Sequence, residues 1–457
     1  MVAVWLLAVA PWLLGTSRRL RWALRWLRLG SVWLPAVTPW LPSVAALALV
    51  AACASTPAPP SPSTRTAPTT SMPSKLATSP TFADDVAFLR EHGDVTVLEA
   101  PNGARVAVSA KYQGRVMTSA VAVDAPSLGW VNRAFILAGK TRTAFDNYGG
   151  EDRFWLGPEG GQFALYFAPT KPFAFSEWQT PPALQEGAWA VKESTPISVT
   201  FTRAMTLASW SGTTFELTVT RTVRLVDLAK ANAWGARLAS ASAASAKSVA
   251  FETVNTITNT GARAWQRETG LVSIWILGMF APSADARIVV PYRHDAPAGS
   301  PIVNDRYFGK IPAERLRVRD DDACVVLTAD GHYRSKIGLS PARATGTLAS
   351  YSASTRLLTL VTIAPPDPSK PYVDNMWEKQ ASPFGGDAVN AYNDGPTEPG
   401  KPSLGGFYEL ESSSPAAALA PGESLVHVHQ TTHVVVDDAV KAALDAGALP
   451  VSARCLY

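Results

Sequence analysis

Apolar and polar residues alternate along much of the chain, a pattern typical of strands that bury one face. Strands are predicted where this alternation coincides with β-branched residues and ends at turn signals: 105–109, 115–123, 197–202, 214–225, 248–258, 271–280, 288–291, 324–329, 357–363, 406–411 and 424–436. Helical spacing is found at 81–92, 226–247 and 437–447. Many strands and few helices in one long segment predict an all-β fold, a large antiparallel β-sandwich.

The N-terminal part of the chain departs from this pattern. Residues 1–15 and 31–52 are apolar, an arginine-rich segment lies between them, and small residues precede Cys53. This arrangement is typical of a bacterial lipoprotein signal peptide over 1–53, in which the thiol of Cys53 carries the lipid anchor. The alternative is an uncleaved transmembrane helix over 31–52, which is long enough to span but contains prolines and leaves the cysteine without a role.

Residues 54–80 are dominated by Pro, Ser and Thr and have no apolar period. Such a segment cannot bury a core, so we expect a disordered tether between the lipid and the folded part. The folded domain is then 81–457, a single sandwich at the upper end of the usual size range. We expect the chain in the bacterial cell envelope, lipid-anchored, facing the periplasm or on the outer membrane.

The charge balance gives no reason to expect a nucleic acid partner. The formal net charge is +4, but it includes the arginines of the leader: Arg18, Arg19, Arg21, Arg25 and Arg28. Without them the mature chain is close to neutral, and its expected partners are the membrane, through the lipid, and a carbohydrate.

Apart from Cys53, the chain contains two cysteines, Cys324 and Cys455. An even pair in an oxidising compartment predicts a disulfide that closes a long loop and holds the C-terminus. The alternative is two buried free thiols.

The first of two glycine-rich blocks, 146–162, contains Arg153, Trp155 and Glu159. Glycines allow the backbone to approach a ligand closely. Aromatic faces stack on sugar rings, and guanidinium and carboxylate groups bond hydroxyl groups. We therefore expect these three residues to bind substrate; the alternative is a structural corner with a buried Arg–carboxylate pair.

The second block, 374–395, contains Trp377 and Glu378 before a further glycine pair. Its composition resembles that of the first block, so we expect these two side chains to line the same cleft. The segments 306–310 and 333–336 add cations on loops that could rim a cleft.

The same block holds four oxygen-bearing residues, Asp387, Asn390, Asn393 and Asp394. Oxygen ligands this close, with glycine to bend the chain, suit calcium, although their spacing is not that of an EF-hand. The alternative is a set of solvated turns, and we expect no other cofactor.

Three histidines, His427, His429 and His433, share the parity of one predicted strand. Residues two apart on a strand lie roughly 6.6 Å apart, so the first two are close enough to share a metal, whereas His433 is not. They are also candidates for acid and base groups that converge with Glu409 or Glu411 on one sheet face. The third alternative is a row of hydrogen-bonded structural histidines; the sequence does not identify a metal.

Short motifs at 254–261, and at 407–411 leading through 419–424, resemble galactose-mutarotase-like (aldose epimerase-like) proteins. The block 149–159 resembles a family of uncharacterised bacterial lipoproteins placed near that superfamily. Together these likenesses cover most of 95–436, and they imply a β-supersandwich with a concave sheet that faces a sugar.

In the superfamily, a histidine acid and a glutamate base open the sugar ring. Glu409 or Glu411 falls where the base would be, but 271–280, where the histidine would be, contains none. The resemblance thus leaves epimerase, lyase or hydrolase chemistry open, but it does not support the standard aldose epimerase mechanism. The catalytic candidates are Glu409, Glu411, His427 and His429. We expect an envelope lipoprotein that binds or processes a carbohydrate; the alternative is a non-catalytic structural or scaffold lipoprotein.

Overall fold

The computed structural model describes residues 79–139, 141, 144–241 and 247–457. They belong to one of the two compact units into which the chain divides, Lys75–Tyr457. The leader, its Cys53 and most of the tether lie outside the described residues. Within the described part, no helix has the length and apolar character needed to cross a membrane.

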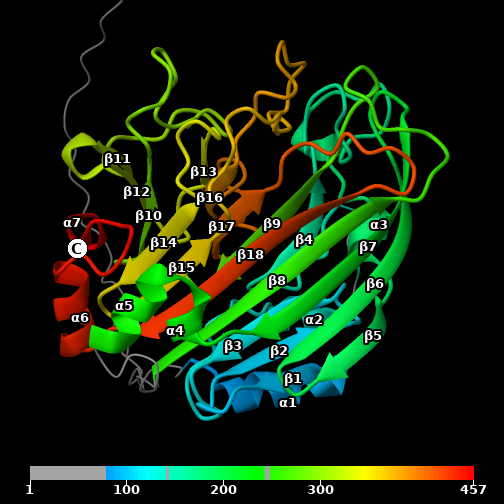
Figure 1. Cartoon of the computed structure of the whole chain (residues 1–457). Helices are drawn as coiled ribbons and strands as arrows, with labels where there is room; N and C mark the ends of the chain where they lie inside the picture. Colours follow the sequence, from blue (N-terminus) through cyan, green and yellow to red (C-terminus); the bar gives the residue numbers. More distant parts are fainter. Residues whose placement is uncertain (1–78, 140, 142–143, 242–246) are drawn as a thin grey trace, which may run out of the picture. The chain divides into compact units, whose positions relative to one another are not determined.

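The described residues form three sheets, and neighbouring strands within each sheet are antiparallel (Figure 1). The largest has ten strands, in the order β11 (Leu316–Arg319), β12 (Cys324–Thr328), β10 (Arg287–Pro291), β14 (Thr347–Ser352), β15 (Leu357–Thr362), β18 (Ser424–Val435), β8 (Ser248–Asn259), β7 (Thr214–Leu225), β6 (Ser198–Ala208) and β5 (Ala190–Thr195). The second has five strands, in the order β13 (Ser335–Leu339), β16 (Val389–Asn393), β17 (Tyr408–Ser413), β9 (Ser273–Phe280) and β4 (Arg153–Gly157). A small sheet contains β1 (Thr96–Glu99), β2 (Arg105–Ser109) and β3 (Arg115–Ala120).

The main core lies between the two larger sheets. Strand β7 alternates buried and more exposed residues along its length, as a strand with one covered face must. Its buried Val219 and Val223 belong to the same hydrophobic cluster as Ile274 and Ile276 of β9. The predicted all-β antiparallel sandwich is therefore confirmed.

Helices lie around the sheets rather than between them. The first, α1 (Phe82–His92), begins at a capping box in which the Thr81 side chain accepts from the backbone N–H of Asp84 and the Asp84 carboxylate binds back to Thr81. A cluster of apolar side chains joins the helices near the C-terminus to one end of the large sheet. The remaining helices are α2 (Arg133–Ala138), α3 (Pro182–Gln185), α4 (Leu228–Ala231), α5 (Ala233–Ala241), α6 (Asp438–Asp445) and α7 (Ala453–Leu456), with short 3-10 turns at Phe175–Glu177 and Asp320–Asp322.

Strand β5 forms one edge of the large sheet, and all six of its residues are exposed. Its pairing with β6 is interrupted between Val191 and Glu193, so Lys192 forms a bulge in the edge.

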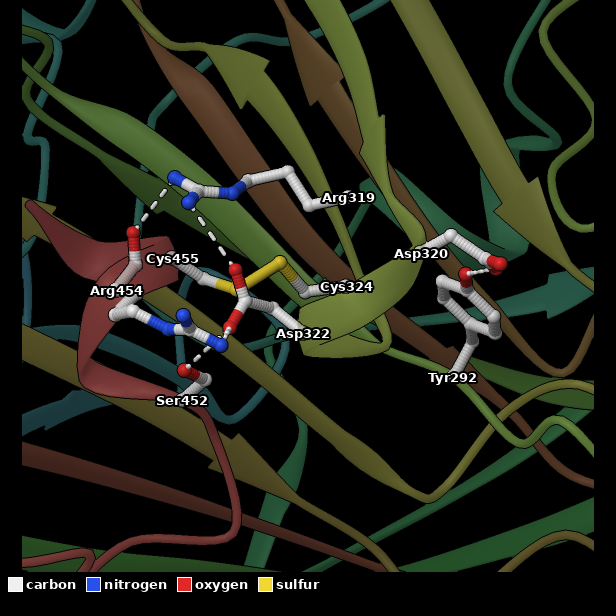
Figure 2. Close-up of a disulfide and its surroundings, with 8 residues drawn as sticks. All are labelled: Tyr292, Arg319, Asp320, Asp322, Cys324, Ser452, Arg454 and Cys455. Atoms are coloured by element: carbon white, nitrogen blue, oxygen red, sulfur yellow. Dashed lines mark hydrogen bonds and ion pairs between the residues drawn. A yellow bond between two sulfur atoms is a disulfide. The ribbon is translucent and has the colours of Figure 1, made fainter.

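Cys324 and Cys455 form a disulfide, one of the two alternatives considered from the sequence (Figure 2). The bond joins β12 to α7 across a sequence separation of 131 residues. Beside it, the Asp322 carboxylate forms ion pairs with Arg319 and Arg454. In the chain-entropy model, closing a loop of this size stabilises the folded state by roughly 4–5 kcal/mol. The bridge also holds the C-terminal helix α7 against the sheet.

Candidate functional site

A cavity of about 230 Å³ opens on the face of the five-stranded sheet that is turned away from the large sheet. Aromatic side chains form most of its wall, and the charged groups come from strands β4, β13 and β17 and from neighbouring loops. Its lining residues are Ala144, Phe145, Arg153, Trp155, Glu159, Phe175, Trp178, Trp275, Leu277, Phe308, Arg334, Lys336, Trp377, Tyr392, Leu404, Phe407 and Glu409.

Strand alternation positions these groups. In β4, Arg153 and Trp155 line the cavity, whereas Phe154 and Leu156, which alternate with them along the strand, do not. Strand β9 pairs Trp275 with Trp155 and Leu277 with Arg153, so both strands present their cavity-facing residues side by side. The sheet thus has an apolar face toward the core and a polar, aromatic face toward the cavity.

Arg153 and Glu409 form a buried ion pair across the cavity floor. Arg153 Nη2 donates to Glu409 Oε1 at 3.0 Å, and the guanidinium carbon lies 3.9 Å from the centre of the Trp155 ring. Burial raises the pKa of Glu409, and the neighbouring Glu411 adds to the shift, while Arg153 opposes it. Glu409 is therefore easier to protonate than an exposed glutamate.

Lys336 and Glu411 form a second buried pair beside the first. Lys336 Nζ donates to Glu411 Oε2 at 2.9 Å, and Trp275 Nε1 donates to the same oxygen at 2.9 Å. Burial by itself lowers the pKa of Lys336, but the carboxylates of Glu411 and Glu159 outweigh it and raise that pKa. The ammonium is therefore held in its charged form.

The mouth of the cavity is lined by stacked aromatic rings. The Trp377 ring lies 6.2 Å from Trp178 and 6.4 Å from Phe175, and each pair is within 19° of parallel. Glu159 is buried nearby, its backbone N–H bound to Asn375 Oδ1 at 2.8 Å. Burial raises the pKa of the Glu159 carboxyl, while Lys336 and Arg334 act against the shift.

Several polar atoms around the cavity have no partner among the described residues. They include the indole nitrogens of Trp155 and Trp178, Arg153 Nε and Glu411 Oε1. Buried polar groups are normally hydrogen-bonded, so these atoms are exceptions to that rule around one cavity.

Most of the residues expected to bind substrate meet at this cavity. Arg153, Trp155, Glu159, Trp377 and Glu409 line it, and Glu411 lies directly beneath it, bonded to Lys336. Glu378 does not line the cavity; it is exposed to solvent next to Trp377.

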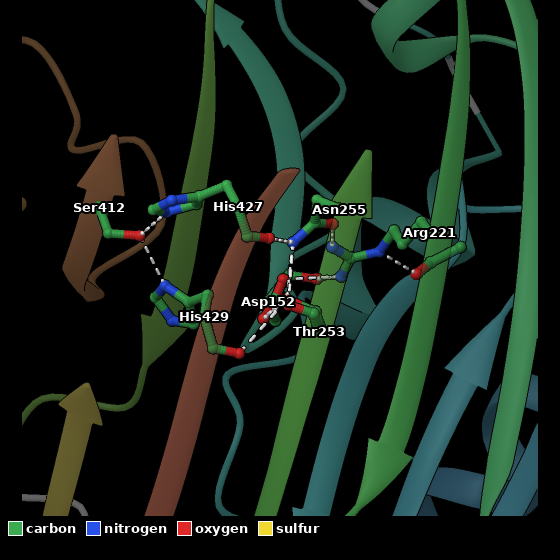
Figure 3. A network of polar contacts seen from close by, with 8 residues as sticks. Asp152, Arg221, Thr253, Asn255, Ser412, His427 and His429 are labelled. Atoms are coloured by element: carbon green, nitrogen blue, oxygen red, sulfur yellow. Dashed lines mark hydrogen bonds and ion pairs between the residues drawn. The ribbon is translucent and has the colours of Figure 1, made fainter. Parts of the chain in front are cut away.

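His427 and His429 do not reach the cavity, so the expected convergence with Glu409 and Glu411 is not found. Both imidazoles bond Ser412 Oγ at 2.8 Å, through His427 Nε2 and His429 Nδ1 (Figure 3). Ser412 follows Glu411 in β17, so its side chain projects from the opposite face, toward the large sheet. The intervening Val428 is exposed on the outer face of the large sheet.

The two histidines belong to a polar network inside the sandwich (Figure 3). At its centre Asp152 and Arg221, both with fully buried side chains, form an ion pair of 2.6 Å. The Thr253 hydroxyl donates to the other oxygen of Asp152, and Arg221 Nη1 donates to the side-chain oxygen of Asn255. His433 lies apart from these contacts and bonds Glu151 and Thr359.

The four residues considered for calcium take part in hydrogen bonds within the protein. Asp387 and Asn390 both bond the Tyr307 hydroxyl, whereas both oxygens of Asp394 bond donors such as Tyr392 and the backbone N–H of Gly406. Within the described part of the chain, no group of three or more His, Cys, Asp or Glu side chains is arranged to hold a metal ion.

Sequence reasoning did not assign Trp178, Trp275, Phe175 or Phe308 to the cavity, and it placed Lys336 on a loop rather than in a strand. Trp275 lies in a predicted strand, and its parity with Leu277 was a usable signal. Trp178 and Phe308 are on loops and Phe175 is in a short 3-10 turn, where no periodicity indicates the direction of a side chain.

A family model described as a family of unknown function, DUF6786, matches residues 80–453, most of the chain. The chain belongs to this family. The resemblance to an uncharacterised family is thereby confirmed, and the match covers nearly the whole described domain. None of the curated protein sequences matches this DUF6786 member.

The solved structures to which it is similar include aldose-epimerase-related proteins, the superfamily that the sequence resembles. One is a putative aldose 1-epimerase from Escherichia coli K12, with 12% identity, a TM-score of 0.43, and coverage of 75% of this chain and 100% of that chain. Another is a galactose mutarotase-like protein from Lactobacillus casei, with 12% identity, a TM-score of 0.41, and coverage of 74% and 100%. A third is an aldose epimerase homologue from C. elegans, with 11% identity, a TM-score of 0.40, and coverage of 75% of this chain and 100% of that chain. Identities and TM-scores this low say nothing about shared site chemistry.

Proposed function

We propose that this protein binds a carbohydrate in the cavity on the five-stranded sheet. The supporting observation is the combination of parallel aromatic rings at the mouth with charged groups that line the floor. A sugar ring presents C–H groups on its faces and hydroxyl groups around its edge. Stacked rings such as Trp377 suit the faces, and charged lining groups such as Arg153 and Glu159 suit the hydroxyls.

Catalysis is a second candidate, favoured by one observation. Glu409 and Glu411 share one strand face at the cavity, and burial raises the pKa of Glu409, as a general acid requires. No histidine is among the described lining residues, which argues against a histidine acid acting at this cavity. Assays for hydrolysis, elimination and epimerisation with a Glu409→Gln variant test this candidate.

Replacing Trp377 by alanine should weaken glycan binding by about tenfold, because stacking against an aromatic ring is worth roughly 0.5–1.5 kcal/mol beyond burial. Trp377→Phe keeps an aromatic face and should retain most of the affinity. Binding is measured by calorimetry with the tightest glycan found on an array. Equal affinity in the two variants would mean that the aromatic mouth does not contact the sugar.

We also propose that a lipid on Cys53 anchors the protein in the cell envelope. The small residues before this cysteine and the tether after it support the proposal. Cells fed radiolabelled palmitate should label the native protein, and Cys53→Ala should lose the label and leave the membrane fraction. Label that persists in the Cys53→Ala protein would exclude this anchor.

A further inference from the structure

The cavity holds three cations, Arg153, Arg334 and Lys336, but they are not equivalent. Arg153 and Lys336 are each paired with a glutamate, Glu409 and Glu411 respectively. Their charges are therefore already balanced within the protein.

Arg334 forms no ion pair with any carboxylate of the described residues, although Glu159 senses its charge. Its guanidinium carbon lies 3.8 Å from the centre of the Phe308 ring and 5.3 Å from that of Phe175. The contacts with the two rings hold the guanidinium beside the cavity. Arg334 is only partly buried, so part of its guanidinium remains for a ligand.

Resting on the proposed carbohydrate function, we propose that the sugar bound here is acidic, bearing a carboxylate or a sulfate group that is received by Arg334. A guanidinium presents two parallel N–H groups to such an anion, and charge-assisted bonds of this kind are about twice as strong as neutral ones. A neutral sugar would leave this cation without a counter-charge.

The other charged groups that face the cavity agree with this assignment. Glu409 is paired with Arg153 and Glu411 with Lys336, and Glu159 forms no ion pair with a described residue, so none of these carboxylates binds the Arg334 guanidinium.

The test is a glycan array in which each acidic glycan is printed beside its neutral counterpart, carboxyl-reduced or desulfated. The native full-length protein should prefer the acidic member of a pair by about tenfold or more. Arg334→Gln should remove this preference, and Arg334→Lys should keep part of it, because the charge remains but the paired N–H groups are lost. Arg317→Gln, an exposed arginine on β11 outside the cavity, is the matched control and should keep the full preference.

The outcomes separate the two proposals. Binding of neutral members as tightly as acidic ones, or a preference that survives Arg334→Gln, would overturn the acidic-sugar assignment and leave carbohydrate binding intact. Loss of the preference on carboxyl reduction identifies a carboxylate, and loss on desulfation a sulfate. If no glycan of either kind binds the native protein, the proposed function itself fails.

Discussion

Acidification from pH 7 to pH 5 should lower the free energy of unfolding of the native protein. The loss should be about 4 kcal/mol larger than the loss in a His427→Gln/His429→Gln variant. Burial lowers the pKa of His427 to about 3 and that of His429 to about 4. In the unfolded chain a histidine titrates near 6.5. The unfolded state therefore takes up protons first, and stability present above about pH 6.5 is lost as the pH falls toward the folded-state values.

Urea unfolding at pH 7, 6 and 5 measures the effect. The comparison isolates the two histidines because Glu409, whose raised pKa acts in the opposite direction, is present in both proteins. Glutamine can still bond Ser412, so the variant should fold. His332→Gln changes an exposed histidine and should leave the pH dependence as in the native protein. Parallel curves for native protein and double variant would mean that these histidines are not held neutral.

Replacing Asp152 by alanine should destabilise the protein by about 3–5 kcal/mol, because Arg221 would remain buried without a counter-charge. Neither side chain of the pair has any solvent exposure. Glu99→Ala is the matched control: it removes the carboxylate of a surface ion pair with Arg105 and should cost about 1 kcal/mol or less.

A second variant separates the lost charge from the lost packing. Replacing Asp152 by alanine and Arg221 by methionine together removes both charges, so much of the loss should be recovered. Chemical unfolding of the variants gives the values. If Asp152→Ala costs no more than Glu99→Ala, the buried pair contributes nothing beyond a surface pair.

The sequence predicted seven of the ten strands of the large sheet, and the alternation is clearest in β6, β7 and β8, which bury one face. Strand β7 lies where the alternation predicted it, at Thr214–Leu225. Strands β5, β11 and β14 of that sheet were not predicted, and neither were β4, β13 and β16 of the five-stranded sheet. All residues of β4, β13 and β16 are buried, since one face packs on the core and the other meets the cavity or its surrounding loops. Polar residues such as Lys336 then stand at buried positions, so these strands show no alternation between apolar and polar residues.

The site was predicted in part, for a similar reason. Residues of the two glycine-rich blocks meet, as their shared composition suggested. His427 and His429 were predicted on the sheet face that carries Glu409 and Glu411, and this was wrong. The reason is that β17 and β18, although consecutive in the chain, belong to different sheets. Parity within a strand is readable from sequence, but which sheet receives the strand depends on long-range pairing.

The bulged, exposed strand β5 bears on how this protein behaves when many copies are crowded together. A sheet edge presents unpaired N–H and C=O groups that a second molecule can extend. Here Lys192 and Glu193 place charges on that edge, and the bulge at Lys192 bends it away from the straight geometry that docking needs. The largest sheet can therefore end in solvent without acting as a template for aggregation.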